Sequence, residues 1–173
     1  MFVIQCTKRL LEELKIDIYK ETMPISNPIF SWHSHFFILN RKKCVIVMNN
    51  KTRFNFILFG LKKADFINLD SLIIKGIREN LLAEGISDDI IDKYLEGCNK
   101  VTYATSSDRS IINQMNEMKR NIEYIFKRDK AEGVETDIQE LNRWLNRFVM
   151  LKLPKLYSGE TMKYELMKLS FSS

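Results

Sequence analysis

Three short apolar runs, separated by polar turns, dominate the hydrophobic pattern between residues 30 and 59. The runs are Phe36–Leu39, Cys44–Met48 and Phe54–Phe59, and the polar stretches between them are Asn40–Lys43 and Asn49–Thr52. Short runs rich in β-branched and aromatic residues, separated by Asn and charged residues, are typical of strands joined by tight turns. The pattern predicts an antiparallel β-meander whose middle strand, apolar at every position, is buried on both faces.

Elsewhere, apolar residues recur at intervals of three and four, which predicts amphipathic helices. These stretches are Lys8–Lys15, Ser71–Ala83 with Asp70 as N-cap, the segment between Ser87 and Gly97, Ser110–Lys127, a segment from Thr136 to about Phe148, and a shorter one over Met162–Leu169. Phe2–Cys6 and Lys100–Thr105 are predicted strands. The order predicts an α+β fold, an antiparallel meander of about four to five strands covered by about five helices.

Length and composition narrow the class of protein. A chain of 173 residues with 45% hydrophobic and 28% charged residues suits one globular domain over residues 1–173, helical from about 108 to 170. No apolar run approaches the roughly 20 residues that span a bilayer, and the N-terminus lacks the order of a signal peptide. We therefore expect a cytoplasmic protein that does not bind membranes. No cofactor motif is present, and we expect no cofactor.

The three cysteines argue against zinc ribbons and disulfide frameworks, because Cys6, Cys44 and Cys98 are odd in number and lack CxxC spacing. Cys6 and Cys44 lie within apolar runs and are expected to be small buried hydrophobes.

Positive charge is concentrated in the first third of the chain. Residues 1–60 carry nine Lys and Arg against four Asp and Glu, which equals the whole net charge of +5. A positive patch on the meander attracts phosphate-bearing ligands such as nucleic acid. The alternative is that turn lysines keep strand ends soluble and protect sheet edges from aggregation.

The expected register of the meander follows from its turns. If both connections contain four residues, Leu39 pairs with Cys44, His35 with Met48, and Met48 with Arg53. Alternate side chains of a strand share a face.

This register predicts a polar cluster at one end of the sheet, formed by His33, His35, Arg53 and Asn55 beside Trp32. The opposite face would carry the core residues Phe36, Ile38, Val45, Val47, Phe54 and Phe56.

Three kinds of chemistry fit the cluster. His-x-His on a strand supplies two metal ligands, but the meander contains no Asp or Glu to complete a site, so no metal is expected. His33 with Arg53 or Arg109 fits a general base and a phosphate clamp, as in metal-independent phosphodiester cleavage. Alternatively, His33 is a structural strand histidine and Arg53 pairs with an acid from another element.

The stretch Thr105–Ser110 is a second candidate site. A Ser/Thr-rich turn before a helix offers backbone N–H groups, hydroxyls and the Arg109 side chain to an anion. Plain helix capping explains the same residues. No glycine-rich phosphate loop, nucleophile elbow or HExxH motif occurs, so the sequence leaves open whether the protein is an enzyme.

Several short motifs resemble a bacterial domain family of unknown function. They are FVIQCTKRLL (2–11), FSWH (30–33), NRKK (40–43), MNNKTR (48–53), GLKKADFINL (60–69), LLAEGI (81–86), DRSIINQMN (108–116) and LNR (141–143). The resemblance implies a small standalone cytoplasmic protein and no particular activity. Family members have Ala-Asn in place of Ser34-His35, which argues against His35 as an essential ligand.

The residues that fall on these motifs are the preferred candidates for a shared site. They are His33, Arg41, Arg53, Asp108, Arg109, Asn116, Asn142 and Arg143. We assign His33, Arg53 and Arg109 as candidate catalytic residues, and the remainder, together with Trp32 and Asn55, as candidate ligand-binding residues.

The leading hypothesis from the sequence is a binding module for nucleic acid, RNA or DNA, or for a protein partner, acting through the basic meander. The alternatives are a metal-independent nuclease or phosphotransfer enzyme, and a toxin–antitoxin or phage-defence component. The oligomeric state is not predicted.

Overall fold

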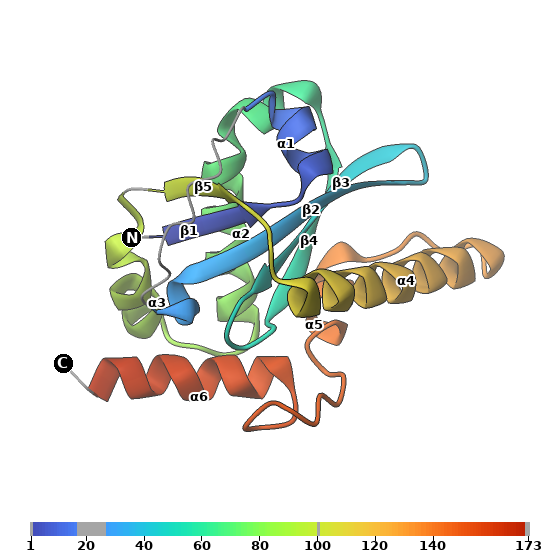
Figure 1. Cartoon of the computed structure of the whole chain (residues 1–173). Helices are drawn as coiled ribbons and strands as arrows, with labels where there is room; N and C mark the ends of the chain where they lie inside the picture. Colours follow the sequence, from blue (N-terminus) through green and yellow to red (C-terminus); the bar gives the residue numbers. More distant parts are fainter. Residues whose placement is uncertain (1, 17–26, 100, 172–173) are drawn as a thin grey trace.

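The centre of the molecule is a five-stranded mixed sheet with the strand order β4-β3-β2-β1-β5 (Figure 1). The computed structural model describes residues 2–16, 27–99 and 101–171. The strands are β1 (Phe2–Cys6), β2 (Ser31–Leu39), β3 (Lys42–Asn49), β4 (Asn55–Leu61) and β5 (Val101–Thr105). β2, β3 and β4 form the predicted antiparallel meander, and β1 runs parallel to both β2 and β5. The predicted α+β fold is confirmed.

Helices cover both faces of the sheet. They are α1 (Lys8–Leu14), α2 (Leu69–Ala83), α3 (Asp88–Leu95), α4 (Arg109–Ala131), α5 (Ile138–Trp144) and α6 (Ser158–Phe171), with short 3-10 turns η1 (Pro28–Phe30), η2 (Lys63–Asn68) and η3 (Glu96–Asn99). Residues of α1, α2, α3 and α6 share one hydrophobic core, and residues of α4 and α5 share a second one. We call these the α2 face and the α4 face. None of the helices in the described residues is long and apolar enough to cross a membrane.

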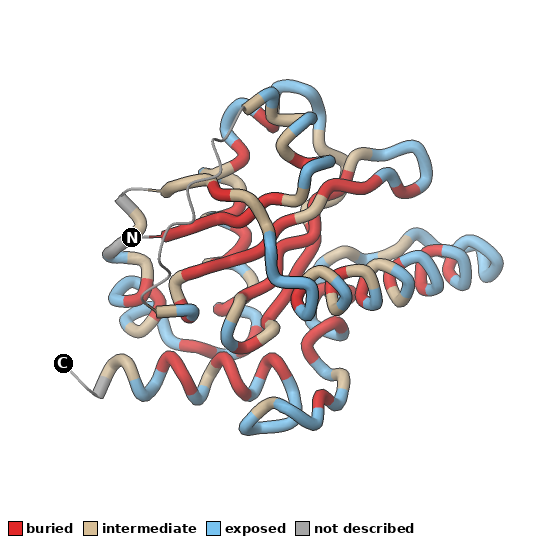
Figure 2. Tube along the Cα trace, in the orientation of Figure 1, coloured by how far each residue is buried: buried red, intermediate tan, exposed pale blue. Residues whose placement is uncertain are grey.

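The meander is buried from both sides, as its apolar pattern predicts (Figure 2). On β3, Val45 and Val47 enter the core of the α2 face, whereas Ile46 and Met48 enter the core of the α4 face. Of the core residues predicted on the α2 face, only Ile38 is not buried, since this residue is 46% exposed beyond the end of β1.

Both hairpins differ from the expected register by two residues. Leu39 pairs with Lys42, not with Cys44, and the connection is the two-residue turn Asn40–Arg41 with φ of 48° and 63°. Two consecutive left-handed residues match the twist of the flanking strands, but Arg is uncommon there and gave no turn signal. Across the next pair, Met48 faces Asn55. A shift of two residues preserves the faces, so the predicted sidedness survives.

Helix boundaries also needed correction. α2 begins at Leu69 after Asn68, not after Asp70, and α4 continues four residues past Lys127. α5 is capped by Asp137, whose carboxylate accepts a hydrogen bond from the Glu140 N–H at 3.1 Å, and not by Thr136. It ends at Trp144, before the predicted Phe148. Most of the segment Asp17–Pro28, which Pro24, Asn27 and Pro28 predict to be a loop, lies outside the described residues.

Candidate functional site

His33 lies on the α4 face of β2, in one row with Gln5, Met48 and Asn55. Its side chain is fully buried, and its Nδ1 lies 2.7 Å from the Asn50 amide oxygen. An amide oxygen only accepts, so Nδ1 carries the proton. The Asn50 amide nitrogen donates in turn to Gln5 Oε1 at 2.7 Å. This chain fixes the tautomer and leaves Nε2 as an acceptor, without a partner in the described part of the protein.

The electrostatic surroundings of His33 include two other predicted site residues. Burial lowers the pKa of His33, the hydrogen bond with Asn50 and the charge of Asp108 oppose that effect, and Arg53 adds to it. Arg53 is half-buried, has φ of 62°, and donates from a guanidinium nitrogen to the Asn50 carbonyl. Because burial lowers the pKa of His33 below 6.5, its imidazole ring is neutral at pH 7. In the described residues no carboxylate lies within ion-pair distance of Arg53, so the expected ion pair is absent there.

The three candidate catalytic residues occupy different environments. Arg53 lines a cavity of about 350 Å³ between the β3–β4 turn, α4 and residues 148–153, but His33 does not. Arg109 is exposed at the start of α4. Asp108 caps this helix by accepting from the N–H groups of Ser110 at 2.9 Å and Ile111 at 3.3 Å. The capping interpretation of this turn is confirmed, whereas a catalytic role for the three residues stays a prediction.

Trp32 does not join the His33 cluster, because it lies on the opposite face of the sheet. Its Nε1 donates to the Tyr94 hydroxyl at 3.1 Å, and its ring packs edge-on against Phe54 and Phe56. Consecutive residues of a strand point to opposite faces, so the neighbour of an inward-facing His33 enters the other core.

Two asparagines of the α5 region cover the free edge of β4. Asn142 accepts from the Ile57 N–H at 2.8 Å and donates to the Ile57 carbonyl at 3.3 Å. In the same way, Asn146 accepts a hydrogen bond from the Asn55 backbone N–H at 2.9 Å and donates one to the Asn55 carbonyl at 2.8 Å. Side-chain amides four residues apart thus imitate a neighbouring strand and satisfy the edge. Asn142 and Asn55, predicted as ligand-binding, here stabilise the fold.

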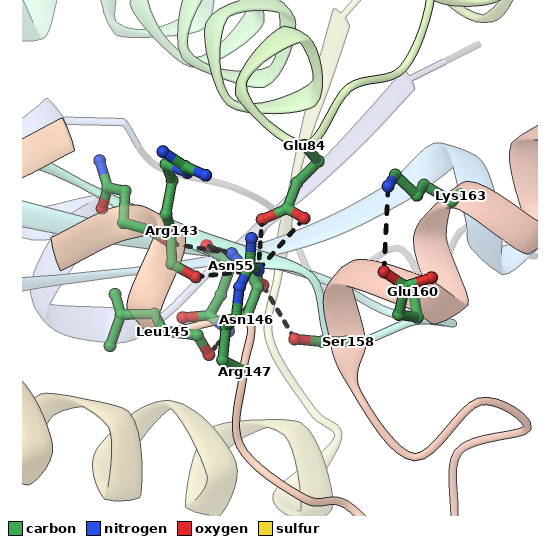
Figure 3. A network of polar contacts seen from close by, with 10 residues as sticks. Asn55, Glu84, Arg143, Leu145, Asn146, Arg147, Ser158, Glu160 and Lys163 are labelled. Carbon is green, nitrogen blue, oxygen red and sulfur yellow. Dashed lines mark hydrogen bonds and ion pairs between the residues drawn. The ribbon is translucent and has the colours of Figure 1, made fainter. Parts of the chain in front are cut away.

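A polar network extends from Asn146 to two other helices (Figure 3). Ser158, at the start of α6, donates its hydroxyl to Asn146 Oδ1 at 2.9 Å. Arg147 donates to the buried carboxylate of Glu84, at the end of α2, at 2.9 and 3.2 Å. The network joins α2, α5, α6 and β4. Sequence reasoning missed Asn146; the one available signal was its spacing of four residues from Asn142.

Two further predicted residues lie on the helices of the α4 face. Arg143 is exposed and lines a groove of about 860 Å³ between β4, α2 and α5, and Asn116 is half-buried on α4.

Within the described ranges, no group of three or more His, Cys, Asp or Glu is placed to hold a metal ion. Cys6 and Cys44 are buried, as predicted.

The basic turn residues separate to the two ends of the meander. Lys51 and Arg53 lie at one end, where Lys51 pairs with Glu165 at 2.9 Å. The β2–β3 turn lies at the other end. Lys43 of β3 lies opposite Leu61 of β4 in the sheet, so Lys62 and Lys63, which follow β4, lie beside this turn. The Lys43–Glu13 ion pair at 3.1 Å joins α1 to the same end. We call this group the basic end; it comprises Lys8, Arg9, Arg41, Lys42, Lys43, Lys62 and Lys63.

The half-buried His35 predicts an acid-sensitive fold. Burial, with Lys119 and Arg9 nearby, lowers the pKa of His35 from 6.5 to about 4. The unfolded chain therefore binds a proton more readily, so stability is lost as the pH falls from about 6.5 towards 4, by roughly 1–2 kcal/mol once solvent screening of the partly exposed ring is discounted. Urea unfolding at pH 7.5 and 4.5 measures this loss. His35→Asn should reduce it, and an equal loss in both proteins would contradict the assignment.

A family model described as Domain of unknown function (DUF6933) matches residues 3–159. No curated protein and no solved structure matches the chain.

Proposed function

Because the chain belongs to this family of domains of unknown function, no activity follows from membership, and we propose that it is a nucleic-acid-binding module. The phosphate backbone docks on the basic end. The observation that carries the proposal is the gathering of cations from α1, the β2–β3 turn and the residues after β4 at one end of the sheet.

These cations are largely free of intramolecular partners. In the described residues only Lys43 of the basic end has a carboxylate within ion-pair distance, namely Glu13. Of the other acids nearby, Asp65 accepts a hydrogen bond from the Lys62 backbone N–H at 2.7 Å. Unpaired, exposed cations are available to neutralise phosphates, which releases the counterions condensed on the nucleic acid, and this release drives nucleic-acid binding. Lys51, at the far end, is already paired.

Charge reversal at the basic end tests the proposal. In fluorescence anisotropy with labelled single-stranded and duplex DNA and RNA at 50–300 mM salt, the unmodified protein should bind with an affinity that falls as salt rises. Arg41→Glu combined with Lys42→Glu should weaken binding at least about tenfold and lower the salt slope by about 2. The matched control is Lys127→Glu with Lys130→Glu, which changes the net charge equally on exposed residues of α4.

The outcomes separate a docking surface from general charge. A loss confined to the basic-end variant supports the proposal. Equal losses of affinity in both variants would show that binding depends only on net charge, and would overturn the proposal. Absence of binding at 50 mM salt would also overturn it, and salt-independent binding would indicate contacts other than phosphate.

A further inference from the structure

The carboxyl ends of β1 and β5 form a switch point in the connections of the sheet. The two strands are parallel neighbours, and the Ser106 N–H donates to the Cys6 carbonyl at 2.9 Å just beyond them. β1 leads into α1, whose Leu10 joins the core of the α2 face, and β5 leads into α4 on the opposite face. Where adjacent parallel strands connect to opposite faces, ligands bind outside their carboxyl ends.

β2 continues beyond this point and exposes part of its edge. The last β1 partner is Ser34, but β2 extends to Leu39. The Asn50 N–H donates to the Ser31 carbonyl, so the odd-numbered residues of β2 hydrogen-bond to β3 and the even-numbered ones face β1. The backbone N–H groups of Phe36 and Ile38 therefore point to the side where β1 has ended.

Two cations flank this edge from opposite faces of the sheet. The Arg9 guanidinium carbon lies 5.2 Å from the centre of the Phe36 ring on the α2 face. The Lys119 ammonium nitrogen lies 5.7 Å from the centre of the Phe37 ring on the α4 face. Phe36 and Phe37 point to opposite faces, but both cations lie close enough to His35 to lower its pKa, so they flank the same short stretch of β2.

Hydroxyl groups lie beside the same stretch. Thr7 Oγ1 is 2.8 Å from Nδ1 of His35, the residue just before Phe36. The Ser106 hydroxyl oxygen is buried and has no hydrogen-bond partner within the described residues. A buried hydroxyl without a partner at the carboxyl end of β1, together with two cations and outward-pointing backbone N–H groups on the neighbouring β2, is a donor set suited to an oxyanion.

We propose that the carboxyl ends of β1 and β5 bind one phosphate group between Arg9 and Lys119, with the hydroxyls of Thr7 and Ser106 as hydrogen-bond donors. The inference rests on the proposed function, because it gives one phosphate of the bound nucleic acid a defined site. The Lys119 ammonium nitrogen also lies 3.7 Å from a carboxylate oxygen of Glu123, a partly exposed pair that an incoming phosphate displaces. Glu123→Gln should accordingly tighten phosphate binding.

The test uses the His35 ring as a reporter on the full chain. NMR titration measures the pKa of His35, which burial and the charges of Lys119 and Arg9 lower to about 4 in the free protein. Saturation with inorganic phosphate should raise it, because the anion offsets the charges of Arg9 and Lys119. Arg9→Gln combined with Lys119→Gln should abolish the response. Arg9→Lys should retain most of it, and Lys127→Gln on the exposed surface of α4 serves as the control.

Oligonucleotides distinguish the source of the phosphate. A dinucleotide with a 5′-phosphate that competes with inorganic phosphate at the site, while the 5′-hydroxyl form does not, indicates a nucleic-acid end. Competition by both forms indicates a backbone phosphate. Response to inorganic phosphate alone would overturn the link to nucleic acid.

Failure of this inference is separable from failure of the proposed function. If phosphate leaves the His35 pKa unchanged, or the Arg9/Lys119 variant responds as the unmodified protein does, the phosphate site is wrong. Nucleic-acid binding through Arg41 and Lys42 would still stand if their charge reversal alone weakens binding. If neither variant alters nucleic-acid affinity, both proposals are overturned.

Discussion

Replacing Asn146 with alanine is expected to lower the free energy of unfolding by about 3–5 kcal/mol. Its amide satisfies the N–H and the carbonyl of Asn55, the Asn142 carbonyl and the Ser158 hydroxyl, all in a buried region. Alanine leaves at least two buried backbone groups on the edge of β4 without partners, and each such group costs about 1–3 kcal/mol.

Urea or guanidinium unfolding of three variants measures this effect. Asn142→Ala removes the amide that satisfies only Ile57, and should therefore destabilise the protein less than Asn146→Ala. Asn113→Ala, on the exposed side of α4, should stay within about 0.5 kcal/mol of the unmodified protein. A loss below about 1 kcal/mol for Asn146→Ala would show that water replaces the amide, contrary to the role assigned here.

Gly76→Ala is expected to destabilise the protein by about 1–3 kcal/mol, although alanine is the better helix former by about 1 kcal/mol. A Cβ at this position of α2 would lie 2.5 Å from Phe56 Cε2. Phe56 is fully buried and packs against Trp32 at a ring distance of 6.2 Å, so its ring has no free space to move into. Gly76 lets α2 approach the sheet closely.

A double-mutant cycle identifies the contact responsible. Phe56→Leu removes part of the ring that meets the new Cβ, at its own cost in stability. In that background Gly76→Ala should become neutral or stabilising, because its helix propensity then acts without the steric conflict. The same loss of stability in both backgrounds would place the conflict elsewhere.

Much of the fold follows from local patterns. The meander, the strand at Phe2–Cys6 and the apolar stripe of α4 are predicted because side chains alternate every two residues in strands and repeat about every 3.6 residues in helices. The predicted register is wrong by two residues, because Asn40–Arg41 lacks the glycine that usually marks a two-residue turn. Because side chains on a strand alternate between the two faces, a register error of two residues still placed His33 on the correct face.

The candidate sites were predictable only in part. His33, Arg53 and Asp108 come from the sequence, and the structure places Arg53 and Asp108 close enough to influence the pKa of His33. Arg9, Lys119 and Ser106 were missed as a group, because they come from α1, α4 and the turn after β5, far apart in the chain. No spacing rule relates such residues, and the proposed grouping depends on the parallel pairing of β1 with β5.

The sequence by itself determined which residues are buried in the meander and that positive charge belongs to its turns, because both depend on near neighbours in the chain. The tertiary structure alone decided the parallel position of β1, the covering of the β4 edge by Asn142 and Asn146, and the division of the cations between two ends. These features depend on hydrogen bonds and ion pairs between distant segments, whose partners are chosen only when the sheet assembles.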